Sequence, residues 1–228
     1  MVRDKTPSSR VTLDTLSLYL VTDATSVGKR RLTDVVAAAV QGGVTCVQMR
    51  EKQLNTRDFV AQGLVLKALL APHHIALVVN DRIDVALACG AQGVHLGQTD
   101  MPVAQARRLL PPEVFIGWSV ESMADVASSA LLDVDYLGVS PIFSTPTKTD
   151  TQAPWGLAGL RSARTATALP LVAIGGIHSG NAMAVIDAGA DGLAVVSAIC
   201  AASDPCAAAR ELGQIIHAGK TLFKSKNK

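Results

Sequence analysis

The stretch ALVVNDRIDVALACGAQGVHL, residues 76–96, is the part of the sequence from which we infer the fold. It begins with an apolar run at Ala76–Asn80, passes through a helix-like segment at Ile83–Ala88, and ends in a second apolar run at Gly93–Leu96. Short apolar strands joined by a helix are typical of a parallel sheet covered by helices. The segment Gly90-Ala-Gln-Gly93 contains glycines, which can adopt the left-handed conformation that ends helices. The stretch therefore predicts a strand–helix–strand unit.

The same alternation recurs along the chain and predicts eight units. The expected strands are Leu16–Thr22, Cys46–Arg50, Ala76–Asn80, Gly93–Leu96, Phe115–Val120, Tyr136–Val139, Leu171–Ile174 and Gly192–Val196. The expected helices are Thr33–Val40, Thr56–Leu70, Ile83–Ala88, Val103–Leu110, Met123–Leu132, Gly156–Ala168, Asn181–Ala188 and Pro205–Ala218. A second Gly-x-x-Gly segment at 189–192 lies about half a barrel after the first and suggests two similar halves. We predict a single α/β (β/α)8 TIM barrel, with an open doubly wound sheet as the alternative.

Composition limits the number of domains and the class of partner. A chain of 228 residues with 49% hydrophobic residues fits one barrel domain. We expect an N-terminal extension at 1–15, a catalytic barrel at 16–219 and a basic tail at 220–228 that is solvated and partly disordered. The net charge of +2 offers no general attraction for nucleic acid or for an acidic membrane. Anion recognition must therefore be local.

The sequence predicts a soluble protein of the cytoplasm. The first ten residues are polar and lack the apolar core of a signal peptide. Gly, Asp, Arg and Gln interrupt every hydrophobic run before it reaches the roughly 18 residues of a membrane span. The four cysteines lack C-x-x-C spacing and lie in apolar or Ala-rich segments, so we expect buried free thiols. The sequence leaves open whether the protein forms a homo-oligomer.

Polar side chains follow the apolar runs, at the barrel end where such folds bind ligands. After the second expected strand, Gln48, Arg50 and Lys52 share one face because side chains alternate with a period of two. The fork of an Arg and the mobile charge of a Lys suit a pyrophosphate. An ion pair between Arg50 and Glu51 on a solvated loop is the alternative.

A carboxylate follows each of the next two strands, Asp81 after the third and Asp100 after the fourth. Such a sparse set of oxygen ligands is what Mg2+ prefers when substrate phosphates and water complete its octahedron. Each carboxylate alone could instead cap a helix, near Ile83 and Pro102 respectively. Because the two strand ends are adjacent, we favour a magnesium site.

The last strand ends are suited to phosphate. The loop Ser140–Asp150 carries hydroxyl groups and Lys148, whose chemistry fits phosphate oxygens, and a plain surface turn is the alternative. Ile174–His178 and Val195–Ile199 follow the seventh and eighth strands, where loops of barrels usually bind phosphate through backbone N–H groups.

Two further polar residues end strands. Ser119 has no G-x-S-x-G frame and no plausible nearby base, so we interpret it as a hydrogen-bonding group and not as a nucleophile. His95 is expected to face the mouth of the barrel, either as a core residue with its hydrogen bonds satisfied or as a ligand contact.

The order of these motifs resembles one family, thiamine phosphate synthase, between Leu18 and Ile199. The motifs that carry the resemblance are Leu18-Tyr-Leu-Val-Thr22, Gln48-Met-Arg-Glu-Lys52, Val79-Asn-Asp-Arg82, His95-Leu-Gly-Gln-Thr-Asp100, Pro141-Ile-Phe-Ser-Thr-Pro-Thr-Lys148, Gly175-Gly-Ile177 and Val196-Ser197. The family joins a pyrimidine activated as a pyrophosphate to a thiazole phosphate. The resemblance implies that pyrophosphate departs first and that the thiazole nitrogen then captures a pyrimidine methylene cation.

The resemblance also implies roles for particular residues. It implies a group that holds the pyrimidine pyrophosphate, made of Gln48, Arg50, Lys52, Asn80 and Lys148. It implies two ligands for Mg2+, Asp81 and Asp100, and a serine near the reacting centre, Ser119. It implies a group that contacts the thiazole phosphate, made of Thr145, Thr147, Gly176, Val196 and Ser197. Among these residues, the resemblance implies a catalytic set of Arg50, Lys52, Ser119 and Lys148.

Two positions depart from the family pattern. Trp118 stands where a smaller residue is usual and Ser144 where Pro is common, so we expect both to alter the shape of the substrate pocket.

Three other functions compete with the synthase. The nearest rival is a thiazole tautomerase of the same barrel type, which would not need the pyrophosphate-binding residues. Another phosphate-binding barrel from amino-acid biosynthesis and a non-catalytic binding protein are the others.

Overall fold

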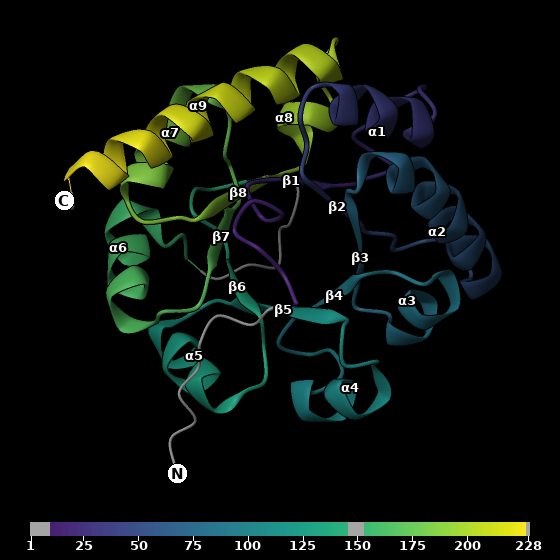
Figure 1. Cartoon of the computed structure of the whole chain (residues 1–228), viewed down its shortest axis with the longest axis horizontal. Coiled ribbons are helices and arrows are strands. Elements are labelled where there is room, and N and C mark those ends of the chain that lie inside the picture. The colour runs from purple at the N-terminus through teal and green to yellow at the C-terminus, as the bar shows by residue number, and fades with distance from the viewer. Residues whose placement is uncertain (1–9, 146–152, 227–228) are drawn as a thin grey trace.

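Eight short apolar strands pair in parallel and close on themselves inside a ring of helices (Figure 1). The computed structural model describes residues 10–145 and 153–226. Its strands are β1 Leu18–Val21, β2 Cys46–Met49, β3 Ala76–Asn80, β4 Gly93–Leu96, β5 Phe115–Val120, β6 Tyr136–Val139, β7 Leu171–Ile174 and β8 Gly192–Val195. Because β1 pairs with β8 as well as with β2, the barrel is closed. The predicted (β/α)8 barrel is confirmed, and the open-sheet alternative is wrong.

Helices connect the strands and cover the barrel from outside (Figure 1). The α-helices are α1 Leu32–Gln41, α2 Thr56–Leu70, α3 Ile83–Cys89, α4 Val103–Leu109, α5 Met123–Ser128, α6 Gly156–Ala166, α7 Ser179–Asp187, α8 Ser197–Cys200 and α9 Pro205–Lys226. Two 3-10 turns follow α2 and α5, at Ala71–His73 and Ser129–Leu131. The sequence analysis missed α8, because four residues are too few to show a helical period.

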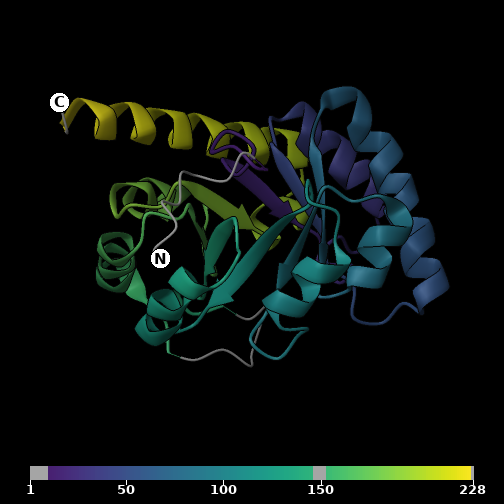
Figure 2. The same cartoon turned by 60° about the horizontal axis from the view of Figure 1, so that its bottom comes forward.

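The C-terminal end differs from the tail that we expected at 220–228. Helix α9 continues to Lys226 and extends past the barrel (Figure 2). Gly219 lies inside the helix, where a Cβ at this position would lie 2.8 Å from Cγ2 of Ile186 in α7. The glycine thus allows α9 to cross α7 closely, and Lys220 donates a hydrogen bond to Ser17 Oγ at 3.0 Å. The last helix therefore runs beyond the predicted end at Ala218.

Glycines on the strands make room for aromatic side chains inside the barrel. The buried interior cluster contains Tyr19, Phe115 and Tyr136. Gly117 lies opposite Tyr136 in the β5–β6 register, and a Cβ on Gly117 would lie 2.1 Å from the tyrosine ring. Gly93 lies opposite Phe115 in the same way, with 2.4 Å between its would-be Cβ and the ring. Interior packing therefore requires small residues at these positions.

We expect Gly117→Ala to lower the free energy of unfolding by about 1–3 kcal/mol, because the added methyl group overpacks the interior against Tyr136. Urea unfolding would measure the loss. Gly213→Ala in α9 is the control, because the nearest side-chain atom to its Cβ would be 4.0 Å away, on Leu18. This control is expected to gain about 0.5–1 kcal/mol from helix propensity. Equal stabilities of the two variants would contradict the packing argument.

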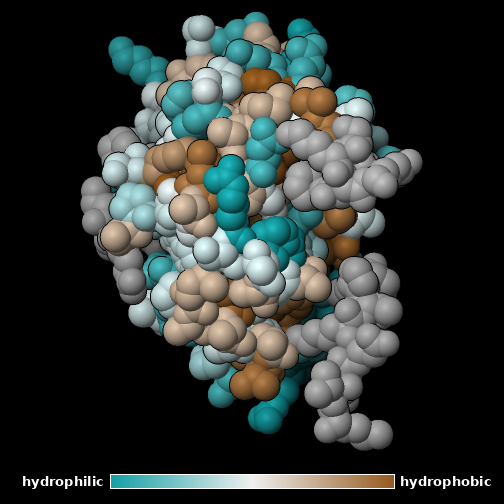
Figure 3. Space-filling model, turned by 90° about the vertical axis from the view of Figure 1, so that its left-hand side faces the viewer, coloured by the Kyte–Doolittle hydropathy of each residue, from teal (hydrophilic) through white to brown (hydrophobic). Residues whose placement is uncertain are grey.

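The outer faces of the strands pack against the apolar sides of the helices in a second, larger core cluster. Trp118 belongs to this outer cluster and is only 9% exposed. On the molecular side that carries α6 and α7, hydrophilic and hydrophobic residues are interspersed (Figure 3).

Three cysteines, Cys46, Cys89 and Cys200, are buried free thiols as predicted, whereas Cys206 is partly exposed.

A repeated hydrogen bond closes the amino-terminal end of the barrel. The side chain immediately before each even-numbered strand accepts a hydrogen bond from a backbone N–H at the start of the preceding strand, at 2.7–2.9 Å. We call these four accepting residues the barrel floor: Thr45, Gln92, Asp135 and Asp191. The pattern satisfies N–H groups that would otherwise be buried without a partner. Gln92 and Asp191 are the third residues of the two Gly-x-x-Gly segments, so the internal repeat in the sequence has a structural counterpart.

Candidate active site

A cavity of about 800 Å³ opens at the carboxyl ends of the strands, opposite the barrel floor. It is lined by every predicted site residue that lies in the described part of the chain: Gln48, Arg50, Lys52, Asn80, Asp81, Asp100, Ser119, Thr145, Gly176, Val196 and Ser197. Thr147 and Lys148 lie outside the described residues. The predicted residues that line the cavity come from the ends of β2 to β8 and the loops that follow, and Tyr19 and Val21 of β1 complete the lining.

One side of the cavity is formed by the end of β2. Gln48 is buried, whereas Arg50 and Lys52 lie on the following loop, where their charged groups reach the cavity. Arg50 pairs with Asp23 at 3.9 Å, so the ion pair with Glu51 that we considered is not its arrangement here. The Lys52 ammonium lies 2.6 Å from Asp81 Oδ2. Acidic neighbours thus hold both cations at the cavity wall.

Asp81 and Asp100 lie close enough for each to change the ionisation of the other. Burial disfavours ionisation of Asp81, but its hydrogen bond with Asp100 and the Lys52 ammonium outweigh burial and lower the pKa of the Asp81 carboxyl. Burial and the neighbouring Asp81 raise the pKa of Asp100. Two oxygen donors in contact beside a cavity fit the ligand preference of Mg2+. Among the described residues, no cluster of three or more His, Cys, Asp or Glu side chains is present.

Neither carboxylate serves as a helix cap, which was the alternative considered for each. The cap positions of α3 and α4 are occupied by Arg82 and Pro102. Asp100 instead accepts a hydrogen bond from the Gly97 backbone N–H at 2.6 Å. Asp81 has a φ of 63°, a conformation that is uncommon outside glycine but tolerated by Asp and Asn. This backbone turn places the Asp81 carboxylate at the cavity rim, beside Lys52.

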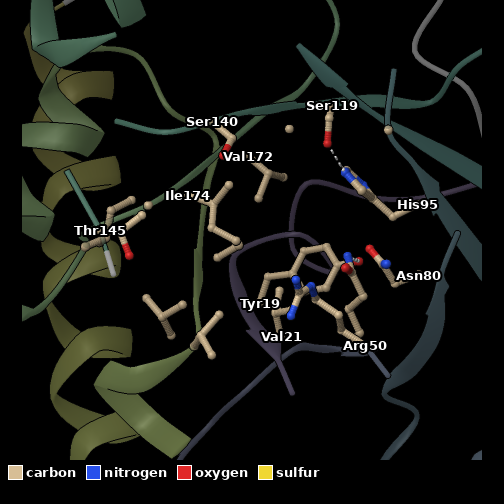
Figure 4. A pocket seen from close by; sticks show the side chains of 18 of the residues that line it. Tyr19, Val21, Arg50, Asn80, His95, Ser119, Ser140, Thr145, Val172 and Ile174 are labelled. Carbon is tan, nitrogen blue, oxygen red and sulfur yellow. Dashed lines mark hydrogen bonds between the residues drawn. The ribbon is translucent and has the colours of Figure 1, made fainter. Parts of the chain in front are cut away.

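The opposite side of the cavity is built by the ends of β6, β7 and β8. Figure 4 shows Thr145 on this side, across the pocket from Arg50 and Asn80. The Phe143 N–H donates to the Gly175 carbonyl at 3.0 Å, and a Cβ on Gly176 would lie 2.8 Å from that of Phe143. The two glycines therefore let the β7 loop pack closely against the β6 loop, leaving their backbone at the cavity wall.

A chain of buried and half-buried polar side chains crosses the barrel at the base of the cavity. His95 Nε2 lies 2.9 Å from Ser119 Oγ, the contact marked in Figure 4, and His95 Nδ1 lies 2.9 Å from Tyr136 Oη. Tyr136 Oη is 3.0 Å from Tyr19 Oη, to which Gln48 Nε2 donates at 3.0 Å. Against expectation, Ser119 thus has an imidazole ring within hydrogen-bond distance, because His95 reaches it from the adjacent strand.

Two residues of this chain of contacts, Tyr19 and Tyr136, were not among the predicted site residues. Both line the cavity, and they are the only two tyrosines in the chain. The period-two alternation that placed Gln48 would also have placed Tyr19 inward on β1. Trp118 does not line the cavity, because it points to the opposite side of β5 from Ser119, whereas Ser144 does line it. Trp118 therefore does not shape the pocket by direct contact with the cavity.

Comparison with known proteins identifies the family. The family model described as thiamine monophosphate synthase matches residues 18–199. A thiamine-phosphate synthase from Albidiferax ferrireducens is 74% identical over 218 residues, which cover 96% of this chain and 100% of that protein. This chain belongs to the thiamine monophosphate synthase family. A solved thiamine phosphate pyrophosphorylase from Pyrococcus furiosus has a TM-score of 0.84 at 37% identity, and the match covers 91% of this chain and 98% of that one.

More distant members support the same family. A thiamine-phosphate synthase from Leptospira biflexa is 49% identical over 192 residues, covering 82% of this chain and 91% of that protein. The predicted family and the predicted enzyme class, a transferase of thiamine biosynthesis, are thereby confirmed. No helix in the described part of the thiamine monophosphate synthase chain is both long and apolar enough to cross a membrane.

Proposed function

We propose that the chain condenses 4-amino-2-methyl-5-hydroxymethylpyrimidine pyrophosphate with thiazole phosphate, giving thiamine phosphate and pyrophosphate. The observation that carries the proposal is the division of one cavity into a cationic, carboxylate-bearing side and a glycine-rich side. The cationic side would hold the pyrimidine pyrophosphate through Gln48, Arg50, Lys52 and Asn80. The side that would hold the thiazole phosphate consists of Thr145, Gly176, Val196 and Ser197. Resemblance alone assigns Thr147 to the thiazole phosphate and Lys148 to the pyrimidine pyrophosphate.

The arrangement suits a dissociative substitution. Negative charge grows on the pyrophosphate as the C–O bond breaks, so cations that are already in place stabilise the transition state more than the ground state. Arg50 and Lys52 would supply that charge, with Lys52 exchanging Asp81 for the leaving group. Asp81 and Asp100 would hold Mg2+, which would contribute further positive charge at the pyrophosphate oxygens. Attack by a neutral ring nitrogen requires no general base to activate it.

A thiazole tautomerase is the nearest alternative function. An isomerisation of a thiazole carboxylate phosphate has no pyrophosphate leaving group. It therefore gives no role to the cations Arg50 and Lys52 or to the neighbouring carboxylates Asp81 and Asp100. Their presence in the same cavity as the glycine-rich loop favours the synthase.

Incubation of the purified protein with both phosphorylated heterocycles tests this function directly. Thiamine phosphate is expected to form only when Mg2+ is present, and oxidation to a fluorescent product would detect it. Omission of either heterocycle is the control. A parallel incubation with the thiazole carboxylate phosphate tests the alternative, since isomerisation there without any condensation would instead establish the tautomerase.

A location in the cytoplasm and assembly into a homo-oligomer are further proposals. Small-molecule phosphates are the partners that the cavity suits, and the three buried thiols are consistent with a reducing compartment. Gel filtration with light scattering would determine the number of subunits.

A further inference from the structure

The chain of side chains under the cavity has a definable direction. Four contacts of 2.9–3.0 Å join five side chains from five different strands. In order along the chain of contacts these are Gln48 on β2, Tyr19 on β1, Tyr136 on β6, His95 on β4 and Ser119 on β5. Each hydroxyl group has a single hydrogen, so a hydroxyl that accepts from one neighbour has its own hydrogen left for the next. The direction of the first hydrogen bond therefore sets the direction of the others.

The first hydrogen bond is donated by Gln48. Its amide Nε2 donates to Tyr19 Oη, which leaves the Tyr19 hydrogen for Tyr136 at 3.0 Å. The Cys46 thiol also adjoins Tyr19, but burial raises the pKa of Cys46, so the thiol keeps its proton and is a weak acceptor. Burial also raises the pKa of both tyrosines, which therefore remain protonated. The Tyr136 hydrogen is then directed to His95 Nδ1.

We propose that this directed chain holds neutral His95 in the Nε2–H form, so that His95 donates to Ser119 Oγ and the Ser119 hydrogen points into the cavity. Tyr136 and His95 are then positioning residues that act through Ser119. His95 is not a base for Ser119 in this arrangement, because its Nε2 carries the hydrogen instead of accepting one. The functional consequence rests on the proposed role of Ser119 near the reacting centre, whereas the state of His95 does not.

Packing around the chain keeps it in place. Tyr19 and Tyr136 are at most 1% exposed. A Cβ on Gly138 would lie 2.8 Å from His95 Cε1, and one on Gly117 would collide with Tyr136. The Ser119 carbonyl additionally accepts a hydrogen bond from Gln98 Nε2 at 2.6 Å. Because both the side chain and the backbone of Ser119 are held, the direction of its hydroxyl is set before substrate binds.

Nitrogen-15 NMR of the whole protein tests the state of His95. Spectra are recorded at mildly alkaline pH, and the His95 signal is assigned among the five histidines by comparison with His95→Gln. We expect Nε2 protonated and Nδ1 unprotonated in the natural protein, and a mixture of tautomers in Tyr136→Phe. Phe115→Leu is the control, because Phe115 packs against Tyr136 but has no polar atom, and it should leave the tautomer unchanged. An Nδ1–H tautomer in the natural protein, or an unchanged one in Tyr136→Phe, would overturn the inference.

A double-mutant cycle tests whether Tyr136 acts through Ser119. Tyr136→Phe should lower kcat roughly fivefold to tenfold, with KM unchanged within about twofold, because one buried hydrogen bond is lost. In the Ser119→Ala background the same change should have no further effect on kcat. Additive losses would show that Tyr136 acts independently and would contradict the inference. The NMR measurement requires no turnover, so it decides the state of His95 even if the proposed reaction fails.

Discussion

Asp81→Asn is expected to lower kcat by about a hundredfold or more, because it removes one of the two carboxylates proposed to hold Mg2+. The same substitution removes the anion that holds the Lys52 ammonium at 2.6 Å, so the lysine loses its fixed position at the cavity wall. Asn is the suitable replacement because it tolerates the positive φ of 63° that Asp81 adopts. Steady-state kinetics over a range of Mg2+ concentrations would measure both the loss of kcat and a rise in the metal required.

The neighbouring Asp84→Asn is the matched control for this prediction. Asp84 lies in the first turn of α3, pairs with Arg82 at 2.5 Å, and is not among the residues that line the cavity. Its loss should leave kcat within about twofold, since exposed ion pairs contribute little. Thermal unfolding of Asp81→Asn should match that of the natural protein. A kcat for Asp81→Asn within about twofold of the natural value would refute the proposed metal site.

Local spacing accounts for the parts of the site that could be predicted from the sequence. Gln48, Arg50 and Lys52 are two residues apart, so alternation places them together once β2 is recognised. Asp81 and Asp100 each follow an apolar run, and the carboxyl ends of neighbouring parallel strands necessarily meet. These inferences require only the strand boundaries and the rule that barrel ligands bind at the carboxyl ends.

The contact between Tyr19 and Tyr136 could not be predicted in this way. The two residues are on β1 and β6, which are not neighbours in the barrel, and their hydroxyl groups meet only because the sheet is closed. The contact also depends on Gly117, whose missing side chain admits the Tyr136 ring. Trp118 is a different case, because alternation with the inward Ser119 on β5 would have placed it on the outer face. Interior contacts of a barrel follow from closure and volume instead of sequence spacing.

Asp135→Asn is expected to lower the free energy of unfolding by about 3 kcal/mol, because it removes the buried carboxylate that Arg10 and Arg107 share. The Asp135 side chain is 0% exposed and receives Arg10 at 3.1 Å and Arg107 at 2.9 Å. The same carboxylate accepts the Ile116 backbone N–H at 2.7 Å as part of the barrel floor. Urea unfolding should show a lower midpoint at an unchanged slope. Turnover per folded molecule should be unaffected, because the barrel floor and the cavity lie at opposite ends of the strands.

Asp133→Asn separates the effect of burial from that of charge. Asp133 contacts the same two arginines, Arg10 at 3.3 Å and Arg107 at 3.4 Å, but its side chain is 57% exposed. Water and salt screen an exposed pair, so this variant should lose less than about 1 kcal/mol. A similar loss in both variants would mean that net charge at this end of the barrel matters more than the buried network. A large loss confined to Asp135→Asn would instead show that one buried carboxylate joins the segment before β1 to α4 and the start of β5.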